Sequence, residues 1–200
     1  MQARILLLPG WQNSGPTHWQ SHWEARYGDL RVEQHDWMQP LRGDWQMQLE
    51  SAVLAEPGPF FLVAHSMGCA LVAAWAAHSR NTQRVCGALL VAPGDLENIP
   101  ALAHLHSWRP MVLQRLPFPS LLLGSQNDPY CSLERARYFA TQWGADFLDY
   151  GPRGHINADV GLGDWPEGRA LLAQRISAAT SANDRLQNSP TSNTSEGSKW

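Results

Sequence analysis

The chain has 200 residues, of which 44% are hydrophobic and 16% charged, and its net charge is -3 at pH 7. This is the composition of a folded chain with a sizeable core, and it excludes a disordered protein. Because the charge is slightly negative, no basic surface is expected for nucleic acid or for an anionic membrane, and neither partner is predicted.

The expected elements begin with a short apolar run at residues 5–8, which stops at Pro9-Gly10 and is typical of a buried strand. Residues 17–27 follow, where Trp19, Trp23 and Tyr27 recur at every fourth position and predict a helix. The same patterns predict further strands at 31–35, 59–64, 85–92, 119–123 and 146–150, and further helices at 43–55, 67–78, 133–143 and 165–179.

Short apolar strands therefore alternate with longer helices. Parallel strands need such crossovers, and strands that are apolar throughout belong to a sheet covered on both faces. We predict a compact α/β fold with a mostly parallel sheet, helices on both faces and little or no cap domain. It forms a single domain over 1–180, followed by a polar tail at 181–200 whose Ser- and Asn-rich composition predicts disorder.

The three cysteines are an odd number without a close-spaced pair, so neither a disulfide framework nor a zinc ribbon is predicted. The apolar run near the N-terminus is shorter than a signal peptide or a membrane span. These two features predict a cytoplasmic protein.

Ligands of an open parallel sheet bind outside the carboxyl ends of its strands. In chain order, the predicted strand ends supply Ser66, Asp128 and His155. Ser, then Asp, then His is the order of an α/β-hydrolase triad. An imidazole can take the proton of a serine hydroxyl during attack, and a carboxylate can orient that imidazole. The expected reaction is acyl transfer with Ser66 as nucleophile, His155 as base and Asp128 as the orienting acid.

The turn around Ser66 fits a nucleophile elbow because small residues, Ala64 and Gly68, stand two positions before and after it. The general motif has Gly first, so Ala64 departs from it. By itself the turn is also compatible with a serine that caps the following helix. Asp128 and His155, each after a later strand, favour the catalytic interpretation.

An oxyanion needs two preorganised N–H donors. The expected donors are the backbone N–H groups of Met67, which begins a helix, and of Trp11, which Gly10 allows to approach closely. The next candidate is Gln12, and the alternative is a plain glycine turn with a core tryptophan. Gln12 and Trp108 are predicted to line the substrate pocket, with the apolar connection 95–118 as one wall.

Other arrangements compete with this one. Asp95 follows a strand and could replace Asp128, and His65 beside Ser66 could act as the base, although it is expected to pack or hydrogen-bond locally. His18 and His22 have the i, i+4 spacing of metal ligands, but the Glu of H-E-x-x-H and a third ligand are missing. No metal and no organic cofactor is therefore predicted.

Four blocks, "LLLPGWQNSGPTHWQSHWE", "FLVAHSMGCALVAAWA", "GSQNDPYCS" and "GPRGHIN", resemble the retinoblastoma-binding-protein-9-like (YdeN-like) small serine hydrolases of the α/β-hydrolase superfamily. The resemblance spans residues 3–178. It implies Ser66, Asp128 and His155 as the triad, no cofactor, and hydrolysis of small acyl esters. Ala before H-S is common in that family, so Ala64 fits it better than it fits the general motif.

The family's name implies a partner bound through an L-x-C-x-E peptide, which this sequence lacks, so that partner is not carried over and any protein partner is left unknown. The predicted activity is a serine esterase that acts on a small-molecule ester or amide. Two alternatives remain open at this point. One is an acyltransferase or amidase with the same triad, and the other is a non-catalytic protein-binding module on a hydrolase fold.

Overall fold

The computed structural model describes residues 3–187, with side chains to residue 181, and contains one six-stranded sheet in the order β2-β1-β3-β4-β5-β6. Every neighbouring pair is parallel. The strands are β1 (Arg4–Leu8), β2 (Leu30–Arg31), β3 (Phe60–His65), β4 (Val85–Val91), β5 (Ser120–Gly124) and β6 (Asp146–Asp149). The α-helices are α1 (Trp19–Tyr27), α2 (Arg42–Ala55), α3 (Met67–Ala76), α4 (Leu133–Trp143) and α5 (Pro166–Gln187). The predicted fold class is confirmed.

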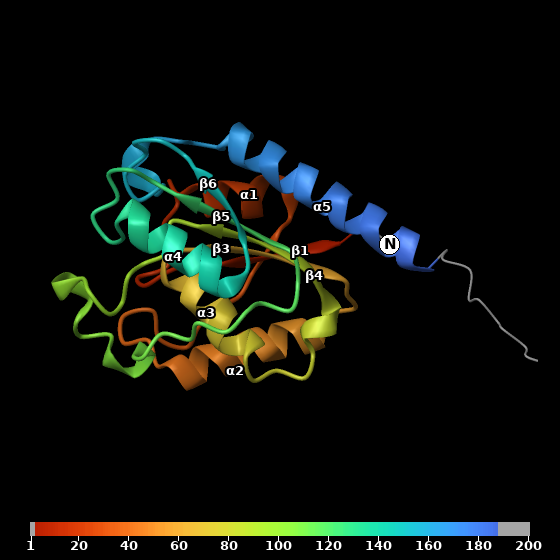
Figure 1. Ribbon diagram of the computed structural model, residues 1–200, viewed down its shortest axis with the longest axis horizontal. Coiled ribbons are helices and arrows are strands. Elements are labelled where there is room, and N and C mark those ends of the chain that lie inside the picture. Colours follow the sequence, from red (N-terminus) through yellow and green to blue (C-terminus); the bar gives the residue numbers. More distant parts are fainter. Residues whose placement is uncertain (1–2, 188–200) are drawn as a thin grey trace, which may run out of the picture.

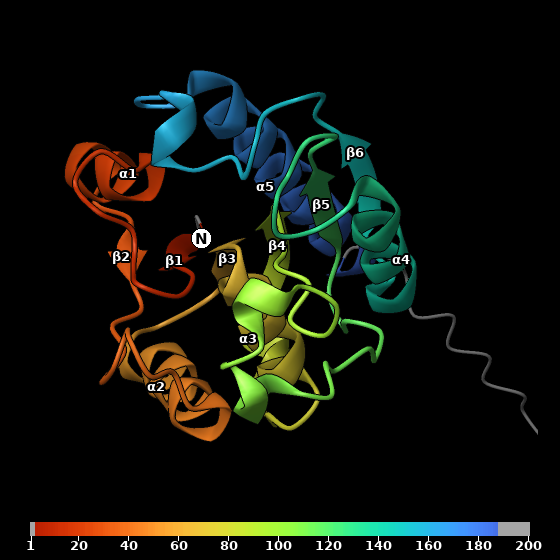
Figure 2. The ribbon, with the colours of Figure 1, turned by 90° about the vertical axis from the view of Figure 1, so that its left-hand side faces the viewer.

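The sheet separates two hydrophobic clusters, because successive strand side chains point to opposite faces. Leu6, Leu62 and Leu90 pack with residues of α2, α3 and α4 on one face. Leu7 and Val63 pack with residues of α1 and α5 on the other. Figures 1 and 2 show these helices on the two sides of the sheet.

Two elements differ from their predicted ranges. The second strand was expected at 31–35, but only Leu30 and Arg31 pair with β1, because the chain then turns away from this edge of the sheet. The last helix was expected to end at 179, but α5 continues to Gln187, since neither Gly nor Pro interrupts residues 169–187. The first part of the predicted tail, 181–187, is thus helical, and 188–200 lie outside the described residues.

The order of the strands reverses between β1 and β3. The chain leaves β1 for β2 on one side and then returns to place β3 on the other. The loops after β1 and β3 therefore diverge, and such a switch point is where open parallel sheets bind ligands. Within residues 3–187, none of the helices is long and apolar enough to cross a membrane.

Candidate active site

Ser66 occupies a sharp turn between β3 and α3. Its backbone has φ 55° and ψ -123°, a conformation that L residues with a side chain rarely adopt. The Ser66 N–H donates to the carbonyl of Val91 on β4 over 3.0 Å, and α3 begins at the next residue. The turn therefore carries backbone strain and directs the hydroxyl away from the sheet, as a nucleophile elbow does.

Two glycines make this turn possible. A Cβ at Gly68 would lie 2.3 Å from the carbonyl oxygen of Leu8, and a Cβ at Gly10 would lie 2.7 Å from Cβ of Ser66. Both distances are far below van der Waals contact. At Ala64, by contrast, the methyl group is fully buried in the core and is accommodated there. The departure from the general motif is thus compatible with the elbow.

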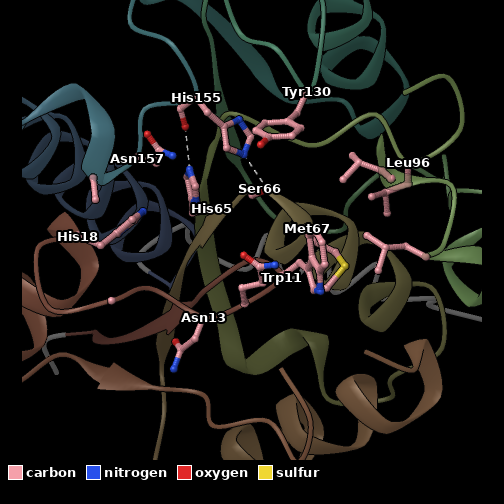
Figure 3. Close-up of a pocket in the computed structure, with 16 residues that line it drawn as sticks. Trp11, Asn13, His18, His65, Ser66, Met67, Leu96, Tyr130, His155 and Asn157 are labelled. Carbon is pink, nitrogen blue, oxygen red and sulfur yellow. Dashed lines mark hydrogen bonds between the residues drawn. The ribbon is translucent and has the colours of Figure 1, made fainter. Parts of the chain in front are cut away.

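The structure brings Ser66, His155 and Asp128 together. Nε2 of His155 lies 2.8 Å from Oγ of Ser66, and Nδ1 lies 2.9 and 2.8 Å from the two carboxylate oxygens of Asp128 (Figure 3 shows the first contact). The side chain of Asp128 is 1% exposed and that of His155 is 8% exposed. The carboxylate also accepts the N–H of Tyr130 over 2.8 Å.

The loops after β5 and β6 are joined by hydrogen bonds that the sequence analysis did not identify. Oγ of Ser125 accepts the N–H of Arg153 over 2.9 Å, and Oδ1 of Asn127 accepts the N–H of Gly154 over 2.7 Å. These bonds hold the loop of His155 against the loop of Asp128. The only sequence signal was the turn-forming composition of "GSQNDPY", which does not indicate a distant partner.

His65 was expected to pack or to hydrogen-bond locally, but its partner is 90 positions away. Its Nε2 donates to the carbonyl oxygen of His155 over 2.8 Å. Burial, together with the nearby imidazoles of His18 and His155, holds the pKa of His65 well below its usual range, so the ring is neutral. His65 therefore supports the loop of His155, and the hydroxyl of Ser66 hydrogen-bonds to the ring of His155 and not to that of His65.

Asp95 forms its hydrogen bonds with residues other than His155. Its carboxylate pairs with the guanidinium of Arg135 over 2.7 Å and accepts the side-chain amide of Asn98 over 2.9 Å. Burial alone would raise the pKa of Asp95, but the hydrogen bonds from Arg135 and Asn98 outweigh it and lower that pKa. The structure thus leaves Asp128 as the carboxylate beside His155.

The proposed oxyanion donors lie beside Ser66. Met67 is the first residue of α3, so its N–H has no acceptor inside the helix. The backbone N–H of Trp11 has no acceptor among the described residues, while its indole N–H donates to the carbonyl of Met38 over 3.0 Å. The N–H of Gln12 donates to the carbonyl of Trp37 over 3.0 Å, so it is not free to bind an oxyanion.

A cavity of about 260 Å³ opens at Ser66. One part of its wall is apolar, and another is polar. The apolar part consists of Trp11, Met67, Leu96, Leu102 and Leu105. The polar part includes Gln12, Asn13, His18, His65 and Asn157. In Figure 3, Leu96 lies on one side of Ser66, and His18 and Asn157 lie on the other.

The predicted place of Trp108 needs correction, because it is not among the residues that line this cavity. Its side chain is 1% exposed, its ring packs edge-on against Trp45, and its N–H donates to the carbonyl of Pro40 over 3.0 Å. The connection after β4 contributes leucines to the wall instead. Gln12, by contrast, does line the cavity.

The i, i+4 histidines of α1 have protein partners. Nδ1 of His18 accepts the N–H of Gln20 over 3.1 Å, and Nδ1 of His22 lies 2.9 Å from a carboxylate oxygen of Asp164. Within residues 3–187, no group of three or more His, Cys, Asp or Glu side chains is placed to hold a metal ion.

Residues 5–174 match a family model described as serine hydrolase. The chain is also similar to a solved structure of a YdeN-like hydrolase from Pectobacterium atrosepticum, with 30% identity, a TM-score of 0.80, and coverage of 89% of this chain and 92% of that one. The ydeN gene product from B. subtilis is 19% identical, with a TM-score of 0.70 over 88% and 99% of the two chains.

An esterase from Rhodococcus sp. ECU1013 shares the fold at 16% identity, with a TM-score of 0.63 over 89% and 91% of the two chains. No curated protein matches the chain in sequence.

Proposed function

Because the chain belongs to the serine hydrolase family and is a YdeN-like member of it, we propose that it hydrolyses carboxylic esters of small acyl groups. The observation that carries the proposal is the chain of contacts from Ser66 Oγ through His155 to Asp128, at 2.8 Å on each side of the imidazole. The hydroxyl donates to Nε2, which must therefore be unprotonated, while Nδ1–H donates to the carboxylate.

The proposed reaction has two stages. Oγ of Ser66 attacks the ester carbonyl as Nε2 of His155 takes its proton, and the carbonyl oxygen becomes an oxyanion held by the N–H groups of Met67 and Trp11. The C–O bond to the alcohol then breaks, and His155 returns the proton to the leaving oxygen. Water attacks the acyl-enzyme by the same route, giving the acid and free Ser66.

Asp128 keeps the His155 imidazole in the tautomer that accepts from Ser66, and it stabilises the imidazolium that forms. The leucines of the cavity wall favour a short apolar acyl group, since they offer no partner for a polar one. We place the protein in the cytoplasm, where its three free thiols would stay reduced.

Labelling with a fluorophosphonate probe, followed by peptide mapping, tests the nucleophile. In the wild-type protein we expect one adduct, on Ser66, and hydrolysis of p-nitrophenyl butyrate. Ser66→Ala should remove both labelling and turnover, while Ser132→Ala, which changes the cap of α4, should keep both. An adduct on another residue, or a Ser66→Ala protein as active as wild type, would overturn the proposal.

A further inference from the structure

His18 lies at the polar side of the cavity and caps the N-terminus of α1. Its Nδ1 accepts the backbone N–H of Gln20 over 3.1 Å, so in the neutral ring the proton is on Nε2. Burial, together with the positive charge of Arg31, lowers the pKa of His18 to about 3, which keeps the ring neutral at pH 7. The residue is only 5% exposed, and its ring is held by its bond to Gln20. His18 therefore offers an uncharged N–H donor in a fixed position.

This donor has no hydrogen-bond partner. Among the described residues, three buried side-chain polar atoms lack one: Nε2 of His18, Oε1 of Gln34 and Nε of Arg109. Of the three residues, only His18 lines the cavity at Ser66. Because a buried donor without a partner costs stability, such a group beside an active site indicates a position where a ligand supplies the acceptor.

The two asparagine side chains of the polar wall have protein partners. The side-chain amide of Asn157 is held in its own turn, where Oδ1 accepts the N–H of Asp159 and Nδ2 donates to the Asp159 carboxylate. Oδ1 of Asn13 accepts from Ser14 N–H and from the guanidinium of Arg31. Among the buried side-chain atoms of the described residues that lack a partner, Nε2 of His18 is thus the one on a residue of this wall.

The geometry also indicates which part of an ester would reach His18, and this step rests on the proposed function. His155 must protonate the leaving oxygen, so the alcohol part of the ester lies beside its ring. The ring centroid of His65 is 4.9 Å from that of His155, and the ring centroid of His18 is 4.8 Å from that of His65. The alcohol part would therefore extend toward His18, and the acyl part toward the leucines (Figure 3).

We propose that Nε2–H of His18 donates a hydrogen bond to an acceptor in the alcohol part of the substrate. The preferred substrates are then esters of alcohols that carry an ether, hydroxyl or carbonyl oxygen a few bonds beyond the ester oxygen. His18 is a specificity-determining residue in this account, because it selects the alcohol part and takes no proton during the reaction.

The test compares esters that differ only in one oxygen: 2-methoxyethyl with butyl butyrate, and 3-methoxypropyl with pentyl butyrate. The measured quantity is the ratio of kcat/KM for the ether to kcat/KM for the alkyl ester. This ratio is divided by the ratio of the rate constants for hydroxide-catalysed hydrolysis of the same two esters. The corrected ratio is then free of the difference in their intrinsic reactivity. In the wild-type protein we expect this corrected ratio to be above one for at least one pair.

His18→Asn keeps an acceptor for the Gln20 N–H, and thus the cap, but has no atom at the position of Nε2. We expect it to lower the corrected ratio by about five- to tenfold. His18→Gln, whose amide reaches as far as Nε2, should restore part of it. His22→Asn, one turn along the same helix and outside the cavity wall, is the matched control and should leave the ratio unchanged.

Circular dichroism establishes which variants are folded. If neither His18 variant folds, the corrected wild-type ratio still decides, because a value of one or less for both pairs would overturn the inference. If the wild-type enzyme is active but His18→Asn leaves the corrected ratio unchanged, the inference is overturned and the proposed function stands. A wild-type protein that neither hydrolyses these esters nor reacts with the fluorophosphonate would overturn the proposed function, and the inference with it.

Discussion

The imidazole of His65 donates a hydrogen bond from Nε2 to the backbone carbonyl oxygen of His155 over 2.8 Å. The residue that precedes the nucleophile thus holds the loop that carries the proposed base. His65 is 5% exposed and pairs with Val91 in the sheet, so its side chain starts from a rigid strand. This contact fixes the backbone of His155, while Asp128 fixes its ring.

Replacing His65 by Phe should lower kcat by about tenfold, because the hydrogen bond that positions His155 is lost while an aromatic ring of similar shape remains. We expect the change in KM to be smaller than the change in kcat. His65→Gln, which keeps a donor at the same reach, should recover part of kcat. A general packing defect would give equal losses in both variants, and that result would contradict a positioning role.

The strained backbone at Ser66 predicts a trade-off between stability and activity. Ser66→Gly should be more stable to unfolding than Ser66→Ala by about 1 kcal/mol, because glycine adopts φ 55° without strain. Relief of such strain is worth about 1–3 kcal/mol. Part of this gain is offset because glycine also has more conformational entropy in the unfolded chain. Urea denaturation measures the difference, and both variants should be inactive. Equal stability of the two variants would show that the turn carries little strain.

Gly68→Ala should destabilise the protein by about 2–3 kcal/mol, because its methyl group would lie 2.3 Å from the carbonyl oxygen of Leu8 and force β1 and α3 apart. The same shift would disturb the turn at Ser66, so turnover should fall as well. Gly43→Ala is the matched control, since its Cβ would meet nothing within 4 Å and α2 should gain from alanine. Loss of stability in both variants would argue against a steric cause.

Asp95→Asn should lower the free energy of unfolding, because it leaves the guanidinium of Arg135 without its buried partner. The folded-state pKa of Asp95 lies below its unfolded value, so the ion pair stabilises the fold above the unfolded pKa, and this stabilisation is lost as the pH falls through the folded pKa. Wild type and variant should therefore differ in stability at pH 7 and converge at strongly acidic pH.

Chemical denaturation at several pH values measures this convergence. Because Asp95 lies outside the proposed triad, the folded variant should still react with the fluorophosphonate at Ser66. A constant difference between the two proteins down to pH 2 would contradict an electrostatic origin. Complete loss of labelling in a folded variant would reopen the assignment of the acid.

Much of the fold follows from the sequence because it rests on local patterns. Apolar runs that end at glycine or proline predict strands, and aromatic side chains at every fourth position predict helices. Since carboxyl ends of parallel strands meet at one edge, the turns after three predicted strands were enough to single out Ser66, Asp128 and His155 before any contact was known. The structure places these three within hydrogen-bond distance.

What only the tertiary structure decided depends on residues that are far apart in the chain. Trp108 is an aromatic residue in the connection 95–118 and was predicted to line the pocket, but it packs against Trp45 in the core. The partner of His65 lies 90 positions away. The unpartnered Nε2 of His18 belongs to a residue of the cavity wall, which the segments that follow β1, β3, β4, β5 and β6 build together. A local pattern specifies an element and its turn, whereas burial and hydrogen-bond partners arise only when distant elements pack together.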